Sequence, residues 1–403
     1  MATMAKRNAQ GSGTIRQRAN GTWEGRFTLG KNAGTGKQVQ KSIYGKTQKE
    51  VRRKLTEITS NIDKGLYVEP SKLTVGAWLD TWLNEFIKMG NTQSGSLAEG
   101  TIFDYTRHIE HYIKPAIGAI RLTDLKPYHI QKVYNELINR KPKPLSAKTI
   151  KNLHSVIHSS LEAAKEQDLI LVNPSDKVKL PKINKTEINP LNEQQQRLLL
   201  EAVKGTELEA IYKAALFTGM RQGELMGLTW DRIDFEKGTI KIDRQMITER
   251  VKGGKHKFSS TKTQKSNRVI MPAPSFMKML KALRVEQKQN KLKAGKMWDE
   301  GDFVGAGLVF TNSYGHNLYK STITNSGSKL GKKIGLPDFR FHDLRHTYAV
   351  NAIKAGDDIK TISSNLGHTT ISITLDLYAH FTDDMRKASS ERMESYLQGI
   401  INL

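Results

Sequence analysis

The chain contains no cysteine. This absence excludes disulfide bonds, cysteine-ligated zinc, iron–sulfur clusters and thiol nucleophiles. The chain also lacks the run of about 18 to 20 apolar residues that a membrane-spanning helix requires, and residues 1–10 lack the apolar stretch of a signal peptide. We therefore expect a soluble cytoplasmic protein without a membrane partner.

Acidic residues are scarce relative to basic ones. The 403 residues include 64 Lys and Arg against 40 Asp and Glu, which gives a net charge of +24. Hydrophobic residues make up 37% of the chain, enough for the cores of two or three domains. The basic surplus attracts polyanions, and nucleic acid is the commonest such partner of a soluble protein. An anionic membrane surface is the weaker alternative.

Basic charge is concentrated near the N-terminus, where residues 1–65 hold 14 basic and 4 acidic residues. Strands are predicted at 13–19, 22–29 and 37–43, followed by a helix from Thr47, with a small core around Trp23. Such a narrow sheet can enter a DNA major groove. The basic side chains on or near these strands are Arg16, Arg18, Arg26, Lys31, Lys37 and Lys41.

Two further regions follow. Apolar residues at helical spacing predict a compact four- or five-helix domain over 73–172, with a helix break at 115–118 and with Trp78 and Trp82 in its core. Three prolines and several lysines predict an extended linker over 173–190. The region 191–403 is predicted to be mostly helical with a small β insert near 239–243 and 268–271, so the fold class is mainly α with small β elements (α+β).

No Gly-x-Ser-x-Gly, His-Glu-x-x-His, P-loop or glycine-rich dinucleotide motif is present. A series of cationic groups stands out instead. Arg221 follows a helix-breaking glycine and begins the next helix, where it can bind an anion or simply pair with Glu224. Lys262 lies in a polar turn before a strand. Either side chain alone is weak support for a site.

The remaining groups come late in the chain. His342 and Arg345 are three residues apart and therefore share one helix face, where they can contact the same phosphate. His368 ends a Leu-Gly-His sequence, and Tyr378 follows ten residues later. A single tyrosine is usually a core residue, but the order of all these groups is specific.

The succession Arg221, Lys262, His342-x-x-Arg345, Leu366-Gly367-His368 and Tyr378 resembles the catalytic signature of the tyrosine recombinases, also called the lambda-integrase or phage-integrase family. The chain looks most like integrases of conjugative transposons. The resemblance implies an arm-type DNA-binding domain at 1–65, a helical core-type DNA-binding domain at 73–172, and a catalytic domain with a C-terminal tail at 191–403. Lys265 is the alternative to Lys262 as the active lysine.

The resemblance implies site-specific integration and excision of a mobile element, with Tyr378 as the nucleophile and a 3′-phosphotyrosyl intermediate. The expected reaction uses no metal, ATP or other cofactor. The expected partners are double-stranded DNA at the element ends, the circular intermediate and the target, four protomers in a synaptic complex, and an accessory directionality or DNA-bending protein. The tail residues expected to dock on a neighbouring protomer are Met385, Ala388, Met393, Leu397 and Ile400.

Three alternatives stay open on the sequence alone. A type IB topoisomerase would use similar chemistry without two classes of DNA site. A non-catalytic DNA-binding regulator would bind duplex without forming a covalent adduct. A metal-dependent nuclease or relaxase ranks last, because the histidines show no tight metal-ligand spacing. His346, His380 and Asp343 lie beside the motifs and are interpreted as packing or supporting groups.

Overall fold

The computed structural model describes residues 13–401 apart from 32–34, 65, 66, 68–71, 91–96, 184–189, 250–253, 261–266 and 368–381. The chain divides into two compact units, residues 1–184 and 185–403. The finer boundaries at 65, 73–172 and 191 remain a prediction. Among the described residues, no helix is both long and apolar enough to cross a membrane.

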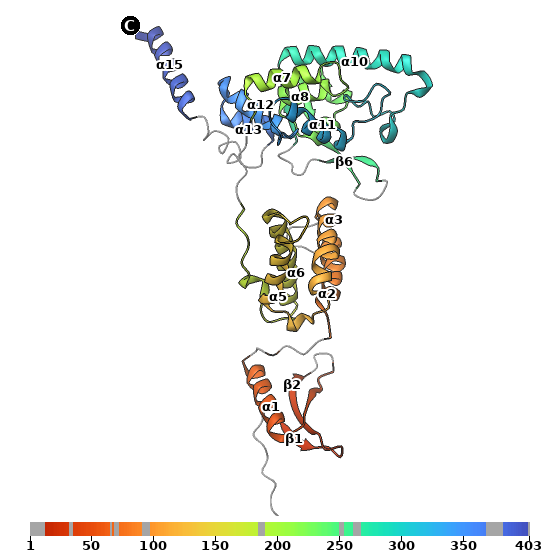
Figure 1. Ribbon diagram of the computed structural model, residues 1–403, viewed down its shortest axis with the longest axis vertical. Helices are drawn as coiled ribbons and strands as arrows, with labels where there is room; N and C mark the ends of the chain where they lie inside the picture. The colour runs from red at the N-terminus through yellow and green to blue at the C-terminus, as the bar shows by residue number, and fades with distance from the viewer. Residues whose placement is uncertain are drawn as a thin grey trace, which may run out of the picture. The chain divides into compact units, whose positions relative to one another are not determined.

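The first unit begins with an antiparallel sheet of strand order β1-β2-β3 and a helix packed against it (Figure 1). The buried centre of this part consists of Phe27, Val51 and Leu55, whereas Trp23 is only half-buried at the start of β2. Gly25 lies between Trp23 and Phe27 on the helix-facing side, and a Cβ there would come within 2.7 Å of Val51. The predicted core around Trp23 is therefore shifted along the strand, because Gly25 lets the helix approach. The elements are β1 (Thr14–Gln17), β2 (Trp23–Lys31), β3 (Gln38–Gly45) and α1 (Gln48–Asp63).

The rest of the first unit is helical, as predicted. Trp78 is buried in its core and donates a hydrogen bond from Nε1 to the Ser160 carbonyl at 2.8 Å, and the Trp82 ring stacks on Tyr105. Both tryptophans are core residues. The elements are α2 (Val75–Thr81), the π-helix η1 (Trp82–Lys88), α3 (Glu99–His108), the π-helix η2 (Ile109–Ile113), α4 (Lys114–Ile117), η3 (Leu122–Asp124), α5 (Pro127–Ile138), α6 (Ala147–Glu166) and η4 (Pro174–Lys177).

The predicted helix break at 115–118 is wrong in its position. The helix that begins at Glu99 continues through Pro115 and ends at Ile117. Proline cannot donate the backbone hydrogen bond of a regular α-helix. The π-helical turn directly before it changes the hydrogen-bond spacing, so that Pro115 falls at the start of α4, where a missing N–H is tolerated.

Part of the segment predicted as a linker packs against this helical core. Asn173 is buried, and its Nδ2 donates to the His158 carbonyl at 3.2 Å and to the Glu162 carboxylate at 3.1 Å. Val178 and Leu180 pack on the same core. Pro174 begins the short helix η4 in this packed part, so the first residues of the predicted linker belong to the helical domain.

The second unit is mostly helical with short antiparallel strands, which confirms the predicted class. Its sheets have the orders β4-β5-β8 and β6-β7, and α10 lies on the side opposite β6 (Figure 1). The β6-β7 hairpin was not predicted. The main elements are α7 (Glu193–Val203), α8 (Glu209–Thr218), α9 (Gln222–Met226), β4 (Ile233–Asp234), β5 (Thr239–Ile242), β6 (Arg244–Thr248), β7 (His256–Ser260), β8 (Arg268–Ile270), α10 (Pro274–Ala294), α11 (Lys320–Lys333), α12 (Asp343–Lys354), α13 (Ile359–Leu366) and α15 (Thr382–Ile401).

The packing of α12 against α8 and α13 brings three sequence motifs together. Gly219 ends α8 in the left-handed conformation at φ +60°, and a Cβ at this position would lie 2.5 Å from the Tyr348 ring and 2.6 Å from Leu366. Only glycine allows both the turn and this close approach. The end of α8, the start of α12 and the end of α13 therefore meet around one point.

Candidate active site

Arg221 lies at this meeting point, as the residue before α9. Its backbone N–H donates to the Glu224 carboxylate at 2.9 Å, and its Nη1 donates to the same carboxylate at 2.8 Å. Its Nη2 donates to the Gly367 carbonyl at 2.9 Å, 146 residues along the chain. Because 34% of the Arg221 side chain remains exposed, Arg221 can pair with Glu224 and still bind an anion. The two roles that the sequence left as alternatives are therefore compatible.

Arg345 is the most deeply buried of the predicted catalytic residues that the structure describes, with 3% of its surface exposed. Nη1 donates to the Gly219 carbonyl at 2.7 Å and Nη2 donates to the Leu366 carbonyl at 2.6 Å. Burial, followed by the charge of Arg221, lowers the pKa of Arg345 to about 9, so the guanidinium stays charged at neutral pH. These two bonds fix the direction of its fork and engage two of its five N–H donors.

Glu224 and Arg268 complete the cluster, and neither was predicted as a site residue. Arg268 donates from Nη2 to the Glu224 carboxylate at 2.8 Å and from Nε to the Asn365 carbonyl at 2.6 Å. Burial opposes ionisation of Glu224, but Arg268 and then Arg221 lower its pKa, so it is an anion. The available sequence signal was an acidic residue directly before the apolar pair Leu225-Met226, since a carboxylate that is buried with such neighbours needs cationic partners.

Three consecutive backbone carbonyls, two at the end of α13 and one at its cap residue, each accept a hydrogen bond from a different arginine. The Asn365, Leu366 and Gly367 oxygens accept from Arg268, Arg345 and Arg221 in that order. A helix C-terminus carries a partial negative charge and has unpaired carbonyls, so it is a suitable anchor for cations. Glu224 balances only part of the charge of these three guanidiniums, and the positive charge that remains suits an incoming phosphate.

His342 precedes α12 at the edge of the same cluster. Its ring lies 5.2 Å from the His346 ring, centroid to centroid, and the two planes are perpendicular. Desolvation of the ring by its neighbours, followed by the charges of His346 and Arg345, lowers the pKa of His342 to about 4. The residue as a whole still has an exposed surface. His342 is therefore a neutral imidazole at pH 7 that solvent or substrate can reach, which is the form a proton acceptor needs.

We expect His342 to titrate well below the ordinary histidine pKa of about 6.5. The neutral ring should persist as the pH falls to about 5 and should take up a proton only near 4. Because the unfolded chain binds this proton at higher pH, the associated stability is present above 6.5 and is lost as the pH falls towards 4. An NMR titration of the histidine rings, assigned with His342→Gln, measures this; a midpoint at or above 6.5 would contradict it.

The other predicted catalytic residues are Lys262, its alternative Lys265, His368 and Tyr378. All four lie outside the described residues, as does His380. Asp343 accepts from the Arg340 backbone N–H at 2.7 Å and from its Nη2 at 2.9 Å, which agrees with the supporting role predicted for it.

The basic residues of the N-terminal sheet separate into two faces. Arg16 and Arg26 both pair with Glu24, at 2.7 and 3.1 Å. The hydrogen bond from Ser42, followed by those from Arg16 and Arg26, lowers the pKa of Glu24 to about 2. Arg18 lies over the Tyr44 ring on the same outer face. Lys41 stands opposite Phe27 in the register and so belongs to the helix-facing side. Lys37 is exposed before β3, and the Lys31 side chain lies outside the described part.

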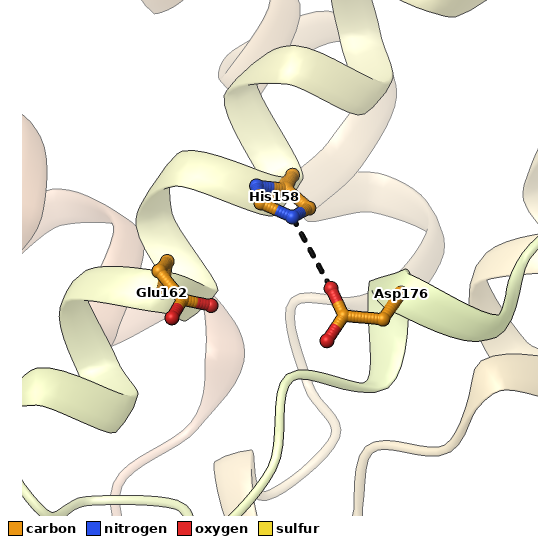
Figure 2. Close-up of side chains that lie close together, drawn as sticks. All are labelled: His158, Glu162 and Asp176. Carbon is orange, nitrogen blue, oxygen red and sulfur yellow. Dashed lines mark ion pairs between the residues drawn. The ribbon is translucent and has the colours of Figure 1, made fainter.

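One group in the helical part of the first unit has metal-ligand character. The donor atoms of His158, Glu162 and Asp176 lie within 4.8 Å of one another (Figure 2). His158 Nε2 pairs with Asp176 at 3.2 Å, while Glu162 accepts from Lys165 at 2.7 Å and from Asn173 at 3.1 Å. The histidine spacing did not predict this group. Its carboxylates already have partners, and we interpret it as the ion-pair network that attaches η4 to α6.

Comparison with known proteins identifies the fold and the family. Residues 183–385 match the phage integrase family, and residues 74–138 match the N-terminal SAM-like domain of phage integrases. A tyrosine recombinase XerC-like protein of Caldanaerobacter subterraneus is 34% identical over 88% of this chain and 90% of that protein. The transposase of transposon Tn916 from Enterococcus faecalis is 25% identical over 86% of this chain and 84% of that protein.

Two solved structures share the fold at low sequence identity. The Tn1549 transposon integrase in complex with a circular intermediate DNA is 21% identical, with a TM-score of 0.65 over 80% of this chain and 99% of that one. A lambda integrase tetramer bound to a Holliday junction is 17% identical, with a TM-score of 0.56 over 92% of this chain and 96% of that one. The family match covers the whole arginine cluster, and the chain belongs to the phage integrase family of tyrosine recombinases.

Proposed function

We propose that Arg221, Arg345 and His342 form the phosphate-binding centre of this recombinase and that Tyr378 is its nucleophile. The chain is an enzyme of DNA strand cleavage and religation, akin to the integrases of conjugative transposons, and it catalyses the site-specific integration and excision of a mobile element. The observation that carries the site assignment is the convergence of Arg221 and Arg345, 124 positions apart, on adjacent carbonyls at the end of α13. The residues between Gly367 and α15 include His368 and Tyr378.

Cleavage of a phosphodiester by in-line attack concentrates negative charge on the non-bridging oxygens. Arg221 and Arg345 each use two donors to hold the protein and have further N–H groups for these oxygens. Guanidiniums bind phosphate in a two-pronged geometry that lysine cannot reproduce. Because their directions are set before DNA arrives, they stabilise the transition state without reorganisation.

The proton transfers follow from the same arrangement. A free tyrosine has a pKa of about 10, so attack at neutral pH requires a base or a cationic surround. In our proposal the neutral His342 accepts the tyrosine proton as the bond from its oxygen to phosphorus forms, and His368 binds the phosphate or shares that role. The bond to the 5′-oxygen breaks, and Lys262 or Lys265 protonates it. A 5′-hydroxyl of another strand then reverses these steps.

We also propose the partners of this reaction. The substrate is double-stranded DNA in the bacterial cytoplasm, which the enzyme binds at the element ends, at the circular intermediate and at the target site. The outer face of the N-terminal sheet, with Arg16, Arg18 and Arg26, supports arm-site contact, while Lys41 is placed less favourably. Four protomers and an accessory directionality or DNA-bending protein complete the complex. The exposed Met393, Leu397 and Ile400 on α15 support docking of the tail on a neighbour, whereas the Met385 and Ala388 side chains lie outside the described part of the chain.

A nicked duplex that carries the end sequence of the element tests this proposal directly. In excess chelator, the wild-type protein should form a protease-sensitive, slower-migrating DNA band on a denaturing gel. Mass spectrometry of the trapped adduct should map the nucleotide to Tyr378. A duplex that is bound but never cleaved would favour the DNA-binding regulator, and cleavage that stops in chelator would favour a metal-dependent nuclease.

A further inference from the structure

Arg268 occupies a position that the proposed reaction has not yet explained. It is the first residue of β8, only two positions after the segment 261–266 that contains both candidate lysines. Its side chain is 6% exposed, although it carries a full charge. Burying an arginine costs free energy unless the N–H groups of its guanidinium find hydrogen-bond or ionic partners.

The partners of Arg268 belong to two different motifs. Two of its nitrogens bond to the Glu224 carboxylate, at 2.8 and 3.2 Å, and Glu224 in turn holds Arg221. Its Nε donates to the Asn365 carbonyl at 2.6 Å, in the last turn of α13. A Cβ on Gly367 would lie 3.0 Å from its Nη1, so the guanidinium also packs against the cap of α13. One side chain therefore connects β8, α9 and α13.

We propose that Arg268 is a positioning residue, which holds Arg221 through Glu224 and holds the end of α13 in the place where Leu366 orients Arg345. This inference rests on the proposed function, since it concerns the same phosphate-binding centre. Arg268 itself need not touch DNA. Its planar fork satisfies Glu224 with one edge while Nε reaches Asn365, and a lysine ammonium cannot make both contacts from one point.

The proposal predicts a loss of cleavage that exceeds any loss of DNA binding. A displacement of about 1 Å in a catalytic group can cost on the order of a hundredfold in rate. Arg268→Met should therefore reduce single-turnover cleavage of the nicked duplex by about a hundredfold while duplex affinity changes by less than about threefold. Arg232→Met is the matched control, because Arg232 also pairs with carboxylates in the second unit, but these are Asp231 and Asp243, which are not part of the arginine cluster.

A neutral substrate separates positioning from a merely structural role. Replacing the scissile phosphate by a methylphosphonate removes the charge that Arg221 and Arg345 balance, so the penalty of Arg268→Met should shrink at least tenfold relative to wild type. A general folding defect would slow both substrates equally. An equal penalty on the two duplexes, or wild-type cleavage of the phosphodiester by Arg268→Met, would overturn the proposal.

Arg268→Lys covers the case in which the methionine variant does not fold. This variant keeps the charge next to Glu224, so its unfolding temperature should lie within a few degrees of that of wild type. It should still cleave DNA at least tenfold more slowly than wild type. Wild-type cleavage by Arg268→Lys would mean that Arg268 only supplies charge to the fold. If the wild-type protein itself fails to cleave, the proposed function fails and not this inference.

Discussion

Tyr378→Phe should abolish the covalent protein–DNA adduct entirely while leaving duplex affinity within about twofold of wild type. The substitution removes one oxygen, and phenylalanine has no group that can bond to phosphorus. In the proposed mechanism the adduct forms only through the oxygen of Tyr378, so no adduct should remain. The measurement is adduct formation on the nicked duplex by denaturing gel, together with a binding titration under the same salt.

Tyr396→Phe is the matched control for this experiment. Tyr396 lies on α15, 67% exposed, 18 residues after Tyr378. Its loss of a hydroxyl should leave adduct formation unchanged. If Tyr378→Phe still forms the adduct while Tyr396→Phe does not, the assignment of Tyr378 is wrong and Tyr396 on α15 is the nucleophile.

Arg345→Ala should reduce single-turnover cleavage by on the order of a thousandfold, the usual cost of removing a transition-state charge donor. Duplex affinity should change far less, because many other basic groups contribute to phosphate binding. The variant should also be less stable, since the Gly219 and Leu366 carbonyls each lose a hydrogen-bond donor, at about 1 to 3 kcal/mol for a buried group. Cleavage is therefore compared well below the unfolding temperature.

Two further variants make the Arg345 result interpretable. Arg345→Lys keeps the charge but cannot bond to both carbonyls and the phosphate, so we expect a loss of at least a hundredfold. Arg284→Ala removes an exposed arginine from α10, over the Trp230 ring, and should cleave as wild type does. If duplex binding and cleavage fall together in Arg345→Ala, the residue serves binding or folding and has no special part in the chemistry.

The family and most of the candidate site residues could be predicted from the order of the motifs along the sequence. Arg221, the His342-x-x-Arg345 pair, His368 and Tyr378 follow one another in a pattern that identified the family before any geometry was known. Helices were predicted well where apolar residues repeat over several turns, as in α6. Pro115 misled the prediction because a π-helical turn, which depends on packing and leaves no sequence pattern, allows the helix to continue.

The supporting contacts could not be read from the sequence. Arg268 and Asn365 are 97 positions apart, and Arg221 and Gly367 are 146 apart, so no local pattern pairs them. The β6-β7 hairpin was missed because its strands are short and polar, with Met246 opposite Phe258 as the main apolar pair. The prediction of a core centred on Trp23 was wrong, because α1 packs closely over Gly25 and a hydrophobic pattern does not register a glycine.

The arginine anchors at the end of α13 also have a consequence for biosynthesis. The ribosome makes residues 221, 268 and 345 before it makes the carbonyls at 365–367 that orient them. A nascent or truncated chain can therefore contain every motif arginine and still lack the ordered phosphate site. In the proposed site, competence to cut DNA arises only after residues 365–367 have been made, so a chain that stops before them would be inert towards the genome.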